Sequence, residues 1–121
     1  MIENKDADLS LLKDYFVDGE VYSKDEILYD LQQKQKEKGF LCVLVDDGFL
    51  IAYPTPRNTL WVSQMVNYGK WRDTRDMIEY AKQWAKERGM IGLVGETDRT
   101  ELRAIKRLGW EQVSIIVGIR V

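Results

Sequence analysis

Histidine is absent from the 121-residue sequence, and cysteine occurs only once, as Cys42. Without histidine the chain has no histidine-based catalytic triad and no Cys/His zinc site, and one cysteine forms no internal disulfide. We therefore expect no metal centre, and the low cysteine content is typical of a protein of the reducing cytoplasm.

Long apolar runs and leader-like segments are also missing. No stretch approaches the roughly 20 apolar residues of a membrane span, and the first ten residues, MIENKDADLS, are acidic and polar. Signal and transit peptides have a different composition. The sequence therefore predicts a cytoplasmic protein with no membrane partner.

Apolar and aromatic residues are plentiful enough for one core. Hydrophobic residues make up 45% of the chain, and four tryptophans and six tyrosines argue against disorder. A chain of this length buries on the order of two thirds of its unfolded surface, without help from disulfides or metals. We therefore expect a single domain over residues 1–121.

Charge is divided unevenly along the chain, although the net charge is only −2. Residues 1–56 hold six lysines, no arginine and twelve acids, whereas residues 57–121 hold twelve basic and eight acidic residues. The basic second half favours an anionic ligand or partner, with solvated helix faces as the alternative. The acidic total argues against a general nucleic-acid binder.

Two helices are predicted within residues 8–38. Apolar residues recur at helical spacing over residues 8–17. Ser23 and Glu26 have the spacing of a capping box, and the helix that they open runs to a stop at Gly39.

The sheet and its crossover helices are predicted within residues 40–121. Residues 40–45 form an almost continuous apolar run, typical of a strand buried on both faces. Asp47-Gly48 is a favoured hairpin turn, after which residues 49–53 return antiparallel. A third strand follows at residues 59–68.

The second half alternates helices and strands. Asp73 is the predicted cap of a helix over residues 74–88, followed by a strand at 90–94 that should lie parallel to strand 59–68. Asp98 opens a last helix before the final strand. The order ααβββαβαβ predicts an α/β (α+β) fold, a mixed central sheet with helices on both faces.

The stretch from about Phe40 onward resembles the GNAT (N-acetyltransferase) superfamily, most clearly around the corner Leu108-Gly109-Trp110. The chain also resembles the small, divergent GNAT-like proteins that bacteriophages encode, which implies a location in the host cytoplasm or a virion. Members of the family hold acetyl-CoA at the start of the helix that follows the central strand. The resemblance places cofactor-binding residues at Val66, Asn67, Gly69, Lys70, Arg72, Thr74, Arg75 and Asp98.

Three parts of the family's machinery are altered in this sequence. Lys70, Arg72 and Thr74 stand where the family's loop has glycines or small residues, so acetyl-CoA is expected to bind weakly or not at all, and any residual binding to be salt-sensitive. Ile105 replaces the tyrosine that protonates the leaving thiolate. Strand 59–68 offers no base, which leaves Glu96 and Tyr68 as weak catalytic candidates.

Two functions therefore stay open. The favoured one is a non-catalytic binding protein or virion-associated protein of phage type, whose partner surface includes Trp71, Arg72 and Arg75 and fits an acidic protein. The alternative is an acyl-CoA-dependent N-acyltransferase with an unknown amine acceptor. That alternative requires strand 59–68 and the next parallel strand to part beyond Val66 and admit the pantetheine arm.

Overall fold

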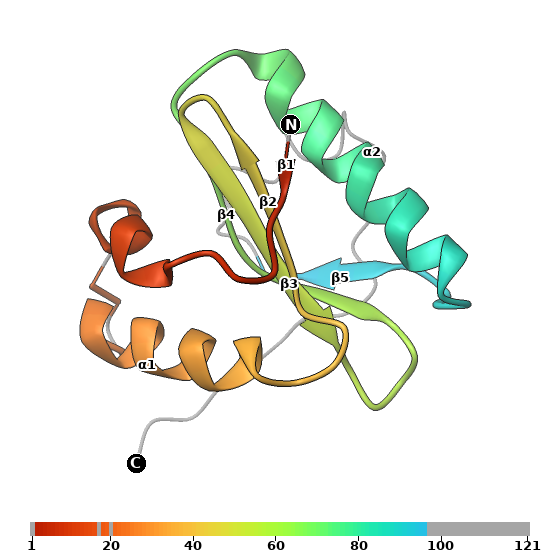
Figure 1. Ribbon diagram of the computed structural model, residues 1–121, viewed down its shortest axis with the longest axis horizontal. Helices are drawn as coiled ribbons and strands as arrows, with labels where there is room; N and C mark the ends of the chain where they lie inside the picture. Colours follow the sequence, from red (N-terminus) through yellow and green to blue (C-terminus); the bar gives the residue numbers. More distant parts are fainter. Residues whose placement is uncertain (1, 17, 20, 97–121) are drawn as a thin grey trace.

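The computed structural model describes residues 2–16, 18–19 and 21–96 (Figure 1). This part holds three helical segments and five strands. Three predicted features lie outside the described residues: the helix after Asp98, which contains Ile105, the corner at 108–110, and the final strand.

The strands form one mixed sheet in the order β1-β2-β3-β4-β5. Neighbours from β1 to β4 are antiparallel, and β5 is parallel to β4. Helix α2 (Trp71–Glu87) joins this parallel pair, which confirms the predicted crossover. The strands are β1 Ile2–Glu3, β2 Leu41–Val45, β3 Gly48–Pro54, β4 Leu60–Asn67 and β5 Leu93–Gly95.

Strand β1 corrects the predicted order, which begins with two helices. Two residues are too few to show alternation of polar and apolar positions, so the sequence carries no signal for this strand. β1 forms because it pairs with the edge of β2, where Ile2 lies opposite Leu44. The N–H of Asn4 continues the pairing by donating to the Cys42 carbonyl at 2.7 Å.

The first helical segment is the 3₁₀ helix η1 (Leu9–Tyr15), within the predicted range. The Asp8 carboxylate caps it by accepting from the N–H of Ser10 at 3.1 Å. Leu9 and Phe16 are buried at its two ends. Burial of these side chains stabilises a segment that is too short to persist alone.

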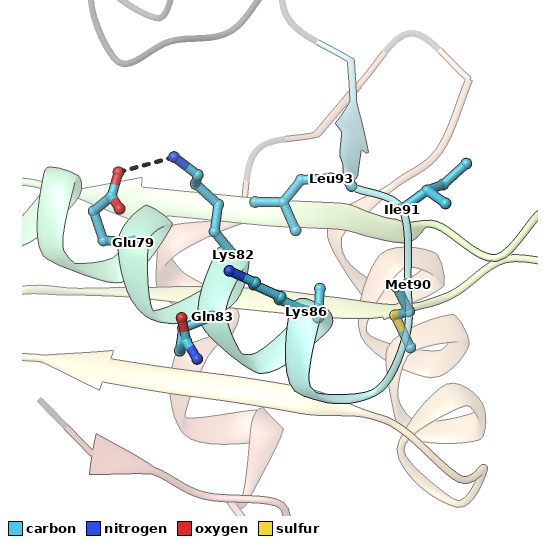
Figure 2. Close-up of a pocket in the computed structure, with 9 residues that line it drawn as sticks. Glu79, Lys82, Gln83, Lys86, Met90, Ile91 and Leu93 are labelled. Atoms are coloured by element: carbon cyan, nitrogen blue, oxygen red, sulfur yellow. Dashed lines mark hydrogen bonds and ion pairs between the residues drawn. The ribbon is translucent and has the colours of Figure 1, made fainter.

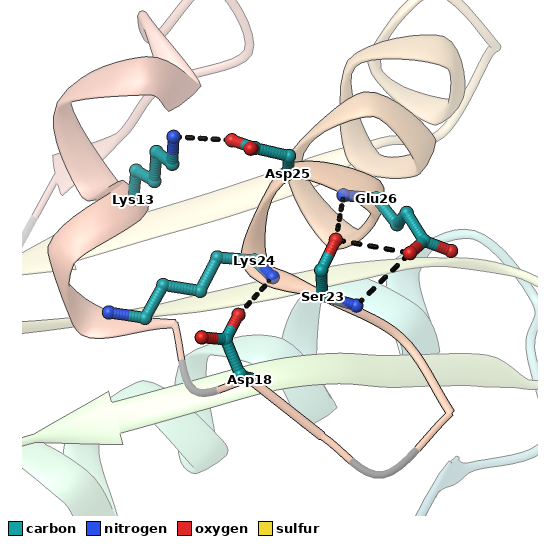
Figure 3. A network of polar contacts seen from close by, with 6 residues as sticks. All are labelled: Lys13, Asp18, Ser23, Lys24, Asp25 and Glu26. Carbon is teal, nitrogen blue, oxygen red and sulfur yellow. Dashed lines mark hydrogen bonds and ion pairs between the residues drawn. The ribbon is translucent and has the colours of Figure 1, made fainter.

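Helix α1 (Lys24–Gln35) begins at the predicted capping box (Figure 3). Ser23 Oγ accepts from the Glu26 N–H at 3.2 Å, and the Glu26 carboxylate accepts from the Ser23 N–H at 3.4 Å. Asp18 accepts from the Lys24 N–H at 2.7 Å, so the preceding loop is tied to the same turn. The helix ends before the predicted stop, and Gly39, with a φ of +83°, redirects the chain into β2.

The β2–β3 hairpin turns one residue earlier than predicted. Val45 pairs with Gly48, so Asp46 and Asp47 form the turn and Gly48 belongs to β3. At Gly48 an added Cβ would lie 2.2 Å from the backbone oxygen of Val66. Close contact with β4 thus explains the glycine better than a turn conformation does.

Helix α2 begins at Trp71, three residues before the predicted start, which moves the cap from Asp73 to Lys70. Asp73 instead lies in the first turn, where its N–H donates to the Lys70 carbonyl at 3.0 Å. A carboxylate is favourable there as well, because it faces the positive end of the helix dipole. The predicted inward face is confirmed, since Met77, Ala81, Trp84 and Ala85 are buried.

Helices cover both faces of the sheet, as predicted (Figure 1). Leu41 and Val43 of β2 pack in the cluster beneath α2. Cys42, between them, packs in the cluster beneath η1 and α1. Successive side chains of a strand point to opposite faces, so the continuous apolar run fills two cores.

The Cys42 side chain is a core residue, as its position in an apolar strand predicts. Burial raises the pKa of its thiol to about 11, which keeps it protonated at neutral pH. Within the described residues, no helix has both the length and the apolar character needed to cross a membrane.

Candidate functional site

The second half of β4 is the most irregular part of the sheet. Gln64 lies opposite Ile51 and Val62 opposite Ala52, so Ser63 is an extra residue and forms a β-bulge. β5 pairs with β4 only from Leu60 to Val62. Among the described strands, residues 63–67 therefore have a hydrogen-bonded neighbour on the β3 side alone.

The predicted parting of the central strands beyond Val66 stays a prediction. β5 ends at Gly95, where it pairs with Val62, and the described residues end at Glu96. The bulge at Ser63 bends β4 just after this pairing ends. Beyond the bulge, an edge of β4 that no described strand pairs leads toward α2.

Polar contacts join the end of β4 to the start of α2. The side-chain amide of Asn67 donates to the Lys70 carbonyl at 2.8 Å and to Thr74 Oγ1 at 2.9 Å. Its oxygen accepts from the Gly69 N–H at 2.8 Å. The structure therefore brings together four of the residues predicted to bind the cofactor.

Three basic residues surround the first turn of α2. Lys70, Arg72 and Arg75 are exposed, and in the described part of the chain none of them forms an ion pair. Thr74 and Arg75 lie in the helix as predicted, and Arg72, predicted to lie in the loop before it, also belongs to α2. Lys70 caps α2 without a side-chain hydrogen bond, so the first helical amides are open to an anion.

Tyr68 lies beside this helix start but has no contact typical of a general base. Its side chain is 69% exposed and stacks on Tyr15, with ring centroids 5.9 Å apart. The Tyr15 hydroxyl donates to the Asp47 carboxylate at 2.9 Å, which raises the pKa of Tyr15. Periodicity could not identify Tyr15 as part of the site, because 53 residues separate it from Tyr68.

Glu96, the other catalytic candidate, is exposed directly after β5. No hydrogen bond or ion pair among the described residues connects it to the end of β4. Asp98 lies outside the described residues. Glu96 therefore adds no contact to the assembly around Asn67 within the described part of the chain.

A separate pocket of about 360 Å³ lies between the second half of α2 and the segment leading into β5 (Figure 2). Met90 and Leu93 provide apolar walls, and Lys82 pairs with Glu79 at 3.2 Å on its rim. Its residues begin at Glu79, beyond the first turn of α2. This pocket was not among the sites predicted from the sequence.

The described part of the chain contains no cluster of candidate metal ligands. No three histidine, cysteine, aspartate or glutamate side chains gather there in an arrangement that could hold an ion. Among the described residues, the groups around Asn67 are the backbone of Gly69 and Lys70, the Thr74 hydroxyl and the basic side chains at the start of α2.

The amino-acid sequence matches no protein-family model and no curated protein. Its fold, however, matches solved acetyltransferase structures. The apo aminoglycoside 6'-N-acetyltransferase AAC(6')-IG from Acinetobacter haemolyticus aligns with a TM-score of 0.71 and 16% identity, covering 100% of this chain and 98% of that chain.

Two further structures agree. Glucosamine-6-phosphate N-acetyltransferase from Arabidopsis thaliana aligns with a TM-score of 0.61 and 13% identity, over 93% of this chain and 88% of that one. AAC(6')-Iy, in complex with a CoA-linked bisubstrate analogue, aligns with a TM-score of 0.62 and 13% identity, covering 78% of this chain and 77% of that chain. With its mixed sheet, bulged β4 and β4–α2–β5 crossover, this chain has the GNAT acetyltransferase fold.

Proposed function

We propose that the protein is an N-acyltransferase that uses a CoA thioester as acyl donor and an amine as acceptor. The observation that carries this proposal is the edge of β4 that starts at the Ser63 bulge, ends at the first turn of α2 and is paired by no strand among the described residues. The edge offers backbone groups to an extended amide-containing arm, and the helix start offers amides and positive charge to phosphates.

The charge at the start of α2 suits the phosphate groups of a CoA thioester. Lys70, Arg72 and Arg75 outnumber the acids Asp73 and Asp76 around the first turns of α2. Arginine in particular binds phosphate through two parallel hydrogen bonds. Glycines, which let the backbone approach phosphate most closely, are missing at these positions, so we expect weaker, charge-dominated binding.

The bound thioester would supply the acyl group, and the chain would orient and polarise it. Backbone N–H groups on the free side of β4 from Ser63 to Val66 are the available donors for the oxyanion that develops during acyl transfer. β4 carries no acidic side chain, so this strand supplies no base for the acceptor amine. Tyr68, exposed beyond the end of β4, is placed to contact the acceptor.

Calorimetric titration with acetyl-CoA tests this proposal. We expect saturable binding that weakens strongly between low and high salt, because mobile ions screen exposed charges. Loss of two charge-assisted hydrogen bonds in Arg72→Ala/Arg75→Ala should weaken binding by at least about tenfold at low salt. The control Lys82→Ala/Lys86→Ala removes the same charge from the second half of α2 and should leave affinity within about twofold.

Absence of saturable binding by the wild-type protein at millimolar acetyl-CoA would overturn the proposal. Tight binding that is insensitive to salt would show instead that the two arginines are not the anchor. Acyl transfer to a panel of amines then identifies the acceptor class.

One observation favours a second function, a non-catalytic binding module. Trp71 is 55% exposed in the first turn of α2, beside exposed Arg72 and Arg75. Tryptophan and arginine are the residue types that dominate interface energetics. This surface would fit an acidic protein partner. A bacteriophage origin and a virion location remain predictions from the sequence.

A pull-down with wild type and Trp71→Ala/Arg72→Ala/Arg75→Ala distinguishes the two functions. For the binding module we expect the triple variant to lose its partner, because the proposed contact residues are gone. For the enzyme we expect acyl transfer to fall while protein association is unchanged. A partner retained equally by both forms would contradict the proposed partner surface.

A further inference from the structure

Tyr68 is an exposed aromatic residue whose ring is nonetheless held in one position. It is 69% exposed, and one face of its ring stacks on Tyr15 with an interplanar angle of 18°. Tyr15 is fixed in turn from two sides. Its ring meets Phe49 edge-to-face at 5.5 Å, and its hydroxyl donates to the Asp47 carboxylate at 2.9 Å. The second face of the Tyr68 ring is therefore presented to solvent on a rigid support.

Asp47 contacts both tyrosines and keeps an unneutralised charge beside them. Its carbonyl accepts from the Tyr68 N–H at 2.9 Å, and its Oδ1 accepts from the Tyr15 hydroxyl. A carboxylate accepts several hydrogen bonds, and no described residue donates to Oδ2. In the part of the chain that the structure describes, no lysine or arginine pairs with this carboxylate either.

An open aromatic face beside a carboxylate attracts one class of ligand group. The face of an aromatic ring is the negative part of its quadrupole, so it attracts cations. The carboxylate adds a full negative charge and an open acceptor. An ammonium group is compact, positively charged and rich in hydrogen-bond donors, so it suits both features.

The charge around Tyr68 is divided between two structural elements. The exposed basic residues belong to the start of α2, which follows Tyr68 in the chain. Asp46 and Asp47, both exposed, form the β2–β3 turn, which contacts the tyrosine pair. An anionic acyl donor is attracted to the first element and a cationic acceptor to the second.

We infer that Tyr68, supported by Tyr15 and Asp47, binds an ammonium group of the acyl acceptor. The inference rests on the proposed function and names its substrate class. The nitrogen that is acylated attacks with a lone pair, which a protonated amine lacks, so the ammonium at Tyr68 is a second group. The reacting nitrogen bonds to the acyl carbon, the carbon–sulfur bond breaks, and the proton lost by nitrogen leaves with the thiol. The preferred acceptor is thus a diamine or polyamine.

Acetyl transfer from acetyl-CoA to 1,5-diaminopentane and to 5-aminopentan-1-ol tests this inference. The two acceptors have the same length and reacting group, but only the diamine has a second ammonium. Per reactive amine, we expect wild-type kcat/KM to be at least about fivefold higher for the diamine. Tyr68→Leu should lower this preference to below about twofold, whereas Tyr68→Phe, which keeps the aromatic face, should retain it.

Matched variants separate the charge from the ring. Asp47→Asn keeps an oxygen for the Tyr15 hydroxyl but removes the charge, so the preference should fall by about threefold. Asp46→Asn makes the same charge change at the neighbouring exposed residue and should change the preference by less than about 1.5-fold. Tyr29→Leu removes a 66% exposed tyrosine that stacks on no other described ring, and we expect no change.

A binding measurement tests the same site without catalysis. We expect the NMR signals of the Tyr68 ring, identified by their loss in Tyr68→Leu, to shift saturably with 1,5-diaminopentane. The neutral 1,5-pentanediol should not shift them at the same concentration.

The outcomes separate this inference from the proposed function. Equal preference in wild type and Tyr68→Leu, or no transfer to the diamine by a protein that binds acetyl-CoA, would overturn the inference alone. Equal shifts with the diamine and the diol would do so too. Absence of acetyl-CoA binding by the wild type would overturn the proposed function, and the acceptor role of Tyr68 with it.

Discussion

Gly48→Ala is expected to damage the candidate site and the sheet together. The added Cβ would lie 2.2 Å from the Val66 oxygen and 2.7 Å from the Asn67 Cα. Both atoms belong to the backbone of β4, so β3 and β4 must move apart at this position. Overpacking of this kind costs about 1–3 kcal/mol. CoA affinity should fall by at least tenfold, because Asn67 moves with its strand.

Urea denaturation followed by tryptophan fluorescence measures the stability loss, and calorimetry measures the loss of affinity. The matched control is Gly92→Ala, where an added Cβ has no neighbour within 4 Å. We expect this variant to stay within about 0.5 kcal/mol of wild type. Equal behaviour of the two variants would contradict the close approach of β3 and β4 at Gly48.

Phe49→Ala should produce the largest loss of stability. The Phe49 ring is fully buried and meets the rings of Phe16 and Tyr15 edge-to-face, with centroids 5.8 and 5.5 Å away. Replacing a buried phenylalanine with alanine costs about 3–5 kcal/mol, a large part of the stability of a small domain. Tyr15 loses its support, so its stacking on Tyr68 at the site should loosen as well.

The midpoint of urea denaturation gives this loss directly. Leu11→Ala is the control, because Leu11 is 76% exposed and its truncation opens no cavity. A loss below about 1.5 kcal/mol for Phe49→Ala would mean that η1 does not pack on β3 as described.

Local signals in the sequence predicted most of the secondary structure. Ser23 and Glu26 identify the start of α1 because a capping box is completed within four residues. Gly39 and Gly89 follow the helices with φ values of +83° and +72°, as left-handed residues there should. The spacing of Met77, Ala81 and Trp84 identifies the buried face of α2.

Predictions that depended on distant contacts were less accurate. Asp73 is a residue type that often caps helices. In the structure, however, the Asn67 side chain donates to the Lys70 carbonyl, and the helix starts at Trp71. Asp47-Gly48 is typical of a hairpin turn. In the structure, however, Gly48 pairs with Val45 and belongs to β3, where it lies close to the Val66 backbone. In both cases the structure differs from the local prediction where a residue on β4 makes a contact that is distant in the sequence.

The candidate site shows the same division between sequence and tertiary structure. Composition and charge alone excluded histidine-based and Cys/His zinc chemistry and placed positive charge at residues 70–75. The order of strands and helices determined the crossover that connects the end of β4 to the start of α2. Only tertiary structure decided that β4 bulges at Ser63, that Asn67 binds Thr74, and that Tyr15 stacks on Tyr68. The physical reason is that these contacts depend on strand register and side-chain packing, which arise when separate segments fold together.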